Sequence, residues 1–188
     1  MRKMLLLLSG LLVLTSCGED PQPKPKAFLA LEYPVAEYEL VDVGCAYTFE
    51  KNKIAQITDS RANNPCWKDL VYKALDGEIF ITYQPVRNNL DSLLRDAQKL
   101  PLQHTIKADV IEGSVYTNPA HRTYGMFYEV EGNAASQAQF YLTDSVNHFL
   151  TGSVYFNAQP NFDSILPAAA YLKKDIRHLM ETVQWREN

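Results

Sequence analysis

The side chains that most often do chemistry in proteins are scattered along this sequence. The four histidines stand at His104, His121, His148 and His178. No two of them have the i, i+4 spacing of a helical metal site, and the chain has no HExxH, P-loop, GxSxG or GxGxxG motif. Glu129 and Glu131 project the same way from one predicted strand, but two carboxylates on a solvated face usually have no part in acid–base catalysis. The sequence therefore predicts no catalytic residue, no metal site and no cofactor.

Among the three cysteines, Cys17 has the clearest surroundings. Arg2 and Lys3 precede an apolar run from Met4 to Leu14, which is too short to span a bilayer and is typical of a removable secretion signal. Leu14-Thr15-Ser16-Cys17 resembles the lipobox of bacterial lipoproteins. Small side chains before the cysteine let a peptidase hold the backbone, and only a thiol can form the thioether to diacylglycerol. We expect cleavage before Cys17 and attachment of the chain to membrane lipid, with palmitate among its acyl chains, through Cys17.

The other two cysteines, Cys45 and Cys66, form an even number in a chain predicted to be exported. An oxidising compartment favours a disulfide, which would close a loop of about 20 residues and stabilise the fold by roughly 3 kcal/mol. The alternatives are a metal pair and a reactive thiol. A metal would need further histidine or cysteine ligands, and a reactive thiol would need a basic neighbour, and neither stands close by in sequence. We predict a structural disulfide between Cys45 and Cys66.

The sequence divides into three parts. Residues 1–16 are the predicted signal, residues 17–27 are the lipidated cysteine and a proline-rich tether, and residues 28–188 are a single globular domain. Removal of residues 1–16 from the chain of 188 leaves 172 residues and shifts the formal net charge from −4 to −6, because Arg2 and Lys3 are lost. This acidic chain has no basic cluster outside Lys173-Lys174, so nucleic acid is not an expected partner.

Alternation and a β-branched or aromatic composition predict several strands. They are Phe28–Tyr33, Tyr38–Val43, Tyr47–Glu50, Glu78–Tyr83, Tyr124–Val130, Gln137–Thr143 and His148–Asn157. Short connections join the last three, which implies antiparallel neighbours. His148 falls on the apolar side of its strand, so we expect a core histidine whose polar atoms are hydrogen-bonded.

Two helices are predicted from apolar stripes at helical spacing. The first stripe comprises Leu90, Leu93, Leu94, Ala97 and Leu100, with Asn88 or Asn89 as the N-cap and Pro101 limiting the far end. The second comprises Ile165, Ala169, Leu172, Ile176, Leu179 and Val183, with Asp163 or Ser164 as the cap and Pro167 in the first turn. On the other sides of this helix, Arg177 and Glu181 have the spacing of an i, i+4 ion pair, and His178 is expected at the surface.

This order of elements predicts an α+β fold, in which an antiparallel strand meander carries packed helices and a long C-terminal helix closes the chain. From Phe28 to Trp185 the order resembles the PsbP-like fold. The likeness is one of architecture and implies no function.

Several segments together carry a more specific resemblance. They are Leu31–Pro34, Cys45–Glu50, Pro65–Trp67, His104–Asp109, Tyr124–Val130, Gly132–Ser136, His148–Ser153, Ile165–Pro167 and Asp175–Thr182. In them, and in its lipobox, the chain is similar to the GldD-type gliding-motility lipoproteins of Bacteroidota. One departure is Ala46, where that family has a proline after the first cysteine of the pair.

This resemblance implies a non-enzymatic lipoprotein needed for gliding and for the associated type IX secretion machinery, with protein partners in that apparatus and no assigned catalytic residues. We expect anchoring in the cell envelope, at the outer membrane, with the periplasmic face favoured. Glu19-Asp20 resembles an acidic surface-export signal, which would favour the outer face instead. The polar runs His104–Asp109 and Arg177–Glu181 are predicted contact surfaces.

Two other functions stay open at this point. The first is a ligand-binding lipoprotein with a tyrosine-lined pocket between sheet and helix, because the chain has eleven tyrosines and eight phenylalanines. Of the aromatic residues in or near predicted strands, core packing would take about half, and the rest could form an exposed aromatic patch for a protein or glycan partner. They are Tyr72, Phe80, Tyr83, Phe127, Tyr128, Phe140, Tyr141, Tyr155 and Phe156. The second is an envelope hydrolase or thiol enzyme, which would require polar residues such as His104, His148, Glu129 and Cys45 to converge in a cleft.

Overall fold

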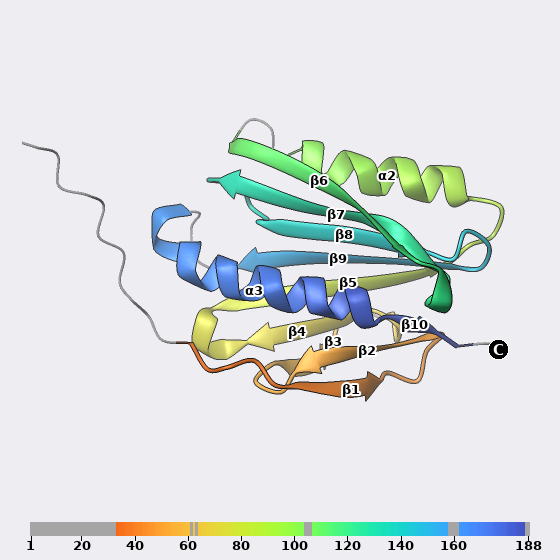
Figure 1. Ribbon diagram of the computed structural model, residues 1–188, viewed down its shortest axis with the longest axis horizontal. Coiled ribbons are helices and arrows are strands. Elements are labelled where there is room, and N and C mark those ends of the chain that lie inside the picture. The colour runs from red at the N-terminus through yellow and green to blue at the C-terminus, as the bar shows by residue number, and fades with distance from the viewer. Residues whose placement is uncertain (1–32, 61, 63, 104–106, 158–161, 187–188) are drawn as a thin grey trace, which may run out of the picture.

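The computed structural model describes residues 33–60, 62, 64–103, 107–157 and 162–186. These residues form two antiparallel sheets and two α-helices, so the predicted α+β fold is confirmed (Figure 1). The predicted strand Phe28–Tyr33 lies outside the described residues except for Tyr33, which is in a loop.

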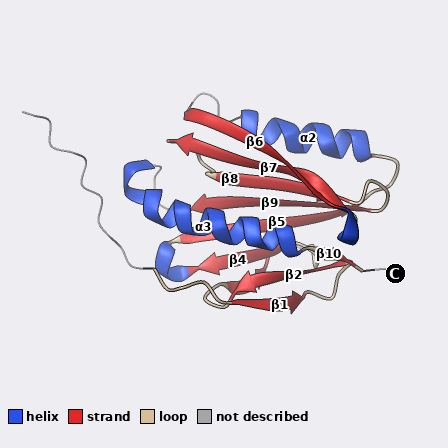
Figure 2. Cartoon of the chain, in the orientation of Figure 1, coloured by secondary structure: helices blue, strands red, loops and turns tan. Residues whose placement is uncertain are grey.

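The larger sheet has seven strands in the order β3-β4-β5-β9-β8-β7-β6, and every neighbouring pair is antiparallel (labelled in Figure 1; strands are red in Figure 2). In chain order its strands are β3 (Gln56–Asp59), β4 (Lys68–Tyr72), β5 (Gly77–Pro85), β6 (Ala108–Asn118), β7 (Thr123–Gly132), β8 (Ala138–Thr143) and β9 (His148–Phe156). Strands β6 to β9 follow one another as a meander, and β5 inserts beside β9, which confirms the meander predicted for the last three strands. Two short 3₁₀ turns, η1 (Lys73–Leu75) and η2 (Pro119–His121), connect strands of this sheet.

The two helices cover opposite faces of this sheet. Alternation along β8 directs Phe140 and Leu142 to one face and Tyr141 to the other. Helix α3 (Phe162–Thr182) buries its predicted stripe against the first face, where each stripe residue is at most 9% exposed. Helix α2 (Leu90–Leu102) packs Leu93 and Ala97 on the second face.

A second, three-stranded sheet lies beside the larger one and packs against the same apolar face of α3 (Figure 1). It has the order β1-β2-β10, with β1 (Tyr38–Asp42), β2 (Tyr47–Asn52) and β10 (Gln184–Trp185). Tyr47 and Phe49 of β2 are fully buried in the same core as the α3 stripe. Helix α3 is therefore the element that both sheets share.

A buried carboxylate also joins α3 to the small sheet. Asp175 of α3 accepts hydrogen bonds from the Tyr38 hydroxyl at 2.8 Å and from the Asn52 amide at 2.9 Å, and Tyr72 of the larger sheet is a third donor. Burial raises the pKa of Asp175, although the three hydrogen bonds act in the opposite direction. Because a buried carboxylate is tolerated only when its oxygens are bonded, these contacts fix the position of the small sheet on the helix.

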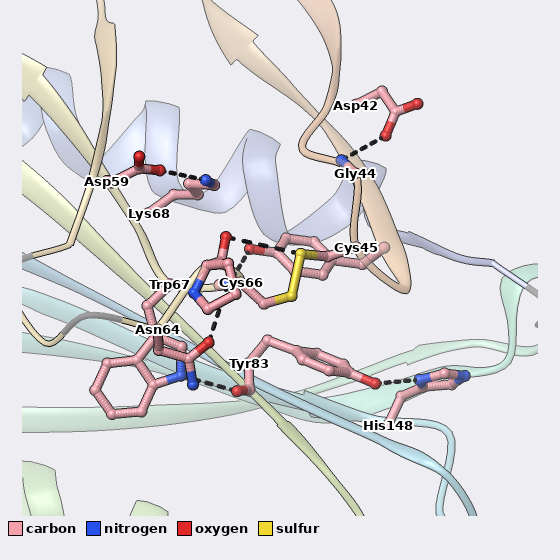
Figure 3. The surroundings of a disulfide bond; sticks show 12 residues. Asp42, Gly44, Cys45, Asp59, Asn64, Cys66, Trp67, Lys68, Tyr83 and His148 are labelled. Carbon is pink, nitrogen blue, oxygen red and sulfur yellow. Dashed lines mark hydrogen bonds and ion pairs between the residues drawn. A yellow bond between two sulfur atoms is a disulfide. The ribbon is translucent and has the colours of Figure 1, made fainter.

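Cys45 and Cys66 are joined by a disulfide with a Cα–Cα distance of 5.8 Å (Figure 3). Cys45 lies in the β1–β2 turn and Cys66 precedes β4, so the bridge ties the small sheet to the larger one. The Tyr47 hydroxyl donates to the carbonyl oxygen of Cys66 at 2.9 Å, beside the bridge. The thiols are consumed, which removes the metal pair and the reactive thiol as alternatives.

Sequence patterns missed four strands, β3, β4, β6 and β10, for physical reasons that differ. β10 has only two residues, which is too few to form a pattern. β3 has four residues, all exposed, so it has no apolar side to reveal it. β4 begins with two charged residues, Lys68 and Asp69, and its buried positions do not alternate, so its sequence shows no strand pattern. β6 forms one edge of the sheet, and most of its residues are exposed, so its sequence lacks alternation.

The predicted N-cap position of α2 at Asn89 is confirmed, but several other details predicted for the two helices differ in the structure. Pro101 lies inside the last turn of α2, because a proline only disfavours helical backbone in the residue before it. Asn89 is the N-cap residue but makes no side-chain cap bond; its Oδ1 instead accepts from the Arg87 backbone N–H at 2.7 Å. Asp163 and Ser164 lie within α3 rather than before it, and Pro167 is also inside that helix beyond its first turn.

We expect the double substitution Cys45→Ala/Cys66→Ala to lower the free energy of unfolding by about 3 kcal/mol, because the unfolded chain regains the entropy of the closed loop. Urea unfolding of the two proteins measures this difference. Reductant should destabilise the natural protein by a similar amount and leave the double variant unchanged. Equal midpoints for the two proteins without reductant would contradict this prediction.

Candidate functional site

A pocket of about 620 Å³ lies at one end of the larger sheet, and we call it the His148 pocket. Four separate segments line it. They contribute Tyr83 and residues 85–87 at the end of β5, residues 120–122 after β6, Asp144, Asn147 and His148 at the β8–β9 turn, and residues 184–186 at β10. Antiparallel register brings them together, because Pro85 pairs with His148 and Tyr124 pairs with Thr143. The pocket is thus a product of the sheet, built on the loops at its end.

His148 lies at the base of the pocket and is 9% exposed. Its Nδ1 is 2.9 Å from the Tyr83 hydroxyl, and its other ring nitrogen points away from that hydroxyl (Figure 3). Trp185 stacks on the imidazole, with ring centroids 5.0 Å apart and an interplanar angle of 12°. Burial lowers the pKa of His148, and Arg122 lowers it further, whereas Asp144 acts in the opposite direction. His148 is therefore neutral at pH 7, and the prediction of a hydrogen-bonded core histidine is confirmed.

Asp144 shapes the turn that carries His148. Its Oδ1 accepts backbone N–H bonds from Val146, Asn147 and His148 at 3.0, 2.8 and 2.8 Å. Its Oδ2 is 3.3 Å from the Arg122 guanidinium. Burial raises the pKa of Asp144, but the three backbone donors outweigh burial and hold it below its usual value. The carboxylate is therefore a charged structural brace for the turn.

Three arginines line the pocket, although they are far apart in the sequence. Arg122 pairs with Asp144, and Arg186 pairs with Asp42 of β1. The guanidinium of Arg87 has no hydrogen bond or ion pair with any residue that the structure describes. No local pattern predicts this cluster, because the three residues form no run and each stands beside ordinary loop residues.

The other polar residues considered in the sequence lie elsewhere and have structural partners. Glu129 binds Arg177 at 2.6 Å and Lys173 at 3.4 Å, and the Arg177 guanidinium lies 4.1 Å from the centre of the Phe127 ring. The predicted i, i+4 pair between Arg177 and Glu181 is therefore wrong, because a strand carboxylate lies closer to Arg177.

His178 is half-buried rather than a surface residue. It stacks on Tyr38 with ring centroids 3.6 Å apart and lies 2.8 Å from Glu50. Of the run Arg177–Glu181, only Glu181 is exposed, so most of this predicted contact surface is occupied by contacts within the domain. His104–Ile106, in the other polar run, lie outside the described residues, and Glu131 is exposed.

These positions do not assemble a catalytic set. His148 contacts Tyr83 and Trp185, Glu129 binds two cations of α3, and Cys45 is in a disulfide. Within the described ranges, no group of three histidine, cysteine or acidic side chains could hold a metal ion. No helix in the same part of the chain is long and apolar enough to cross a membrane.

The predicted tyrosine-lined pocket between sheet and helix is not found in the described structure. The interface of α3 with the larger sheet is filled by the core cluster. A hollow of about 350 Å³ under α2 is lined by residues such as Gln84, Leu93 and Phe149 and by no tyrosine. The predicted exposed aromatic patch is also wrong: every aromatic residue named for it lies in a strand or at a strand end and is buried or half-buried. They are Tyr72, Phe80, Tyr83, Phe127, Tyr128, Phe140, Tyr141, Tyr155 and Phe156.

Comparison with known protein families identifies the family of this chain. The family model for the gliding motility lipoprotein GldD matches residues 18–185, which is most of the chain. The chain belongs to the GldD family. The match begins directly after Cys17 and extends to Trp185, so the whole described domain, with the His148 pocket, falls within this GldD-family match. No curated protein gives a significant match to the chain. Membership associates the protein with gliding motility and with the cell envelope.

We expect Asp144→Asn to lower the free energy of unfolding at pH 7 by about 1–3 kcal/mol, because the charge held by three backbone donors and Arg122 is lost. The folded-state pKa of Asp144 is lower than its unfolded value, so the carboxylate stabilises the fold above the unfolded pKa of about 4. This contribution is lost as pH falls through the folded-state pKa.

Urea unfolding of both proteins between about pH 5 and pH 2.5 measures the effect. The difference between the natural protein and the variant should shrink as the pH falls. Asp96→Asn, at an exposed carboxylate in the middle of α2 and away from the helix ends, is the control and should match the natural protein at every pH. If the free energies of unfolding of the natural protein and of Asp144→Asn differed by a constant or growing amount as the pH fell, the proposed role of the Asp144 carboxylate would be contradicted.

Proposed function

We propose that this protein is a lipid-anchored accessory component of gliding motility and of the associated type IX secretion machinery, and that it acts by binding other proteins rather than by catalysis. The observation that carries the proposal is the match of the GldD family model over residues 18–185. The absence of a converging catalytic set among the described residues is consistent with a binding role.

The anchor is part of the same proposal. Residues 1–16 act as a signal that is removed, Cys17 receives the lipid, and the proline-rich tether up to residue 27 holds the domain that starts at residue 28 away from the membrane. The outer membrane, with the domain on its periplasmic face, is the proposed location. Family membership supports the lipoprotein character of the chain, and the lipobox supports Cys17 as the attachment point.

The edge of the larger sheet offers a surface for protein contacts. β6 is eleven residues long, and no strand among the described residues pairs with its outer side. Val115 on this strand is 76% exposed. An unpaired edge with free backbone donors and acceptors can add a strand of a partner protein, so β6 is where we expect a partner to bind.

Replacement of the lipid-bearing cysteine tests the anchor. In cells that lack the natural gene, we expect Cys17→Ser to leave an uncleaved chain without labelled palmitate and to abolish gliding, because no thioether can form. Ser16→Ala keeps a small residue before the cysteine and should behave as the natural protein. Cleavage and palmitate labelling of the Cys17→Ser chain would contradict lipidation at this residue.

Gene deletion tests the role itself. We expect loss of gliding and loss of secreted type IX cargo, both restored by the natural gene. Gliding and cargo secretion that continue normally after a clean deletion would contradict the proposed function.

Photo-cross-linking in intact cells tests the contact surface. A photoreactive residue at Val115 should capture a specific envelope protein, whereas the same residue at exposed Asp91 of α2 should not. Mass spectrometry of the adducts identifies the partner. The same adducts from both positions would contradict binding at β6.

A further inference from the structure

The His148 pocket concentrates positive charge in an acidic protein. The chain has a formal net charge of −4, yet three of the five arginines in the described ranges, Arg87, Arg122 and Arg186, line this one pocket. They come from three different segments, so the fold and not the local sequence brings them together. Such convergence in a concave site is typical of a place where an anion binds.

The pairing of these arginines sets the charge of the ligand that would fit. Arg122 is neutralised by Asp144, and Arg186 is neutralised by Asp42. Arg87 alone has no partner in the described structure, and its side chain is exposed at the pocket. The pocket therefore has about one uncompensated positive charge, which matches a monoanion better than a dianion. A guanidinium presents two parallel N–H groups, which match the two oxygens of a carboxylate.

The base of the pocket is flat and mostly uncharged. Trp185 and His148 are nearly parallel, and the lowered pKa of His148 leaves its ring neutral at pH 7. The side chains of Asn147 and Gln184 are exposed at the pocket and can bond amide or hydroxyl groups. A volume of about 620 Å³ falls in the range of about 300–1,000 Å³ that is usual for small-ligand sites. The body of a small organic molecule fits these groups better than a bare inorganic ion does.

The loops around the pocket are held in fixed, uncommon conformations. Of the four described non-glycine residues with positive φ, three are next to or in the pocket: Asn88 at 57°, Arg122 at 51° and Ser145 at 69°. Asp144 braces the Ser145 turn, and the Trp185 indole N–H donates to the Arg122 carbonyl at 3.1 Å. Loops fixed in this way lose little entropy when a ligand binds.

We propose that the His148 pocket binds a small carboxylate-bearing ligand, whose carboxylate is held by Arg87 and whose body rests on the Trp185–His148 stack. This site is independent of the proposed anchoring and of strand addition at β6. The carboxylate can belong to the C-terminus of a short peptide or to an acidic sugar, since both present the same anion on a polar body.

Calorimetric titration of the mature lipoprotein in detergent micelles at pH 7 tests the proposal. The probes are N-acetyl-alanyl-alanine with a free carboxylate, the same dipeptide as its amide, glucuronate, and inorganic phosphate. We expect at least one of the two carboxylates to bind, and to shift the indole N–H resonance of Trp185. If the peptide binds, its amide should bind at least about 10-fold more weakly, because it lacks the anion. Whichever of the two carboxylates binds with the lower Kd shows whether the ligand is a peptide C-terminus or an acidic sugar.

Arg87→Gln is the diagnostic variant, since this exposed side chain has no partner in the described domain whose loss would unfold the protein. We expect it to weaken carboxylate binding by about 10-fold or more while leaving the melting temperature unchanged. Arg95→Gln removes an exposed arginine of α2 outside the pocket and should bind like the natural protein. The proposal would be overturned if neither carboxylate bound up to about 10 mM. It would also be overturned if Arg87→Gln and Arg95→Gln bound the carboxylate equally well, or if phosphate bound more tightly than both carboxylates.

Discussion

The burial of one face of helix α3 is the constraint on which the rest of the structure depends. Leu172, Ile176 and Leu179 are at most 1% exposed, and they contribute to a core that includes strands of both sheets. Burial of an aliphatic side chain of this size stabilises a fold by about 1.5–3 kcal/mol, so the stripe is the main link between the two sheets. Without it, the two sheets would be joined mainly by the disulfide, by a few polar contacts and by the ring contacts Tyr47–Tyr83 and Trp185–His148.

Polar interactions then determine how the pieces are oriented. Asp175 joins α3 to β1, β2 and β4, and Glu129 joins the same helix to β7 through Lys173 and Arg177. Apolar packing is not directional, whereas a carboxylate with several donors fixes both angle and register. The disulfide acts at the other end of β2, where it holds the β1–β2 turn beside the segment before β4. Together these contacts fix the position of the small sheet relative to α3 and to the larger sheet.

The candidate binding site is a consequence of this rigid arrangement. β10 adds to β2 through Trp185↔Tyr47, and this pairing brings the C-terminal Trp185 over His148 of the larger sheet. A row of rings, Tyr47, Tyr83, His148 and Trp185, extends from beside the disulfide to the pocket, with centroids 5.0–6.0 Å apart. The pocket thus forms where the two sheets meet. Its loops carry most of the polar and charged side chains, and the sheets fix the positions of those loops, which is the usual division in binding proteins.

The sequence alone determined the features that rest on local pattern. The two apolar stripes predicted both helices, and alternation predicted the strand Gln137–Thr143, because helix and strand periodicity are properties of neighbouring residues. Short connections predicted the antiparallel meander. Strands with no buried side, such as β3, left no pattern to detect. Only the tertiary structure decided which charged groups meet. Arg177 binds Glu129 rather than Glu181, His178 stacks on Tyr38, and Arg87, Arg122 and Arg186 converge on one pocket. These contacts join residues that are far apart in the chain, so they depend on sheet register and on the position of α3, which no local pattern encodes.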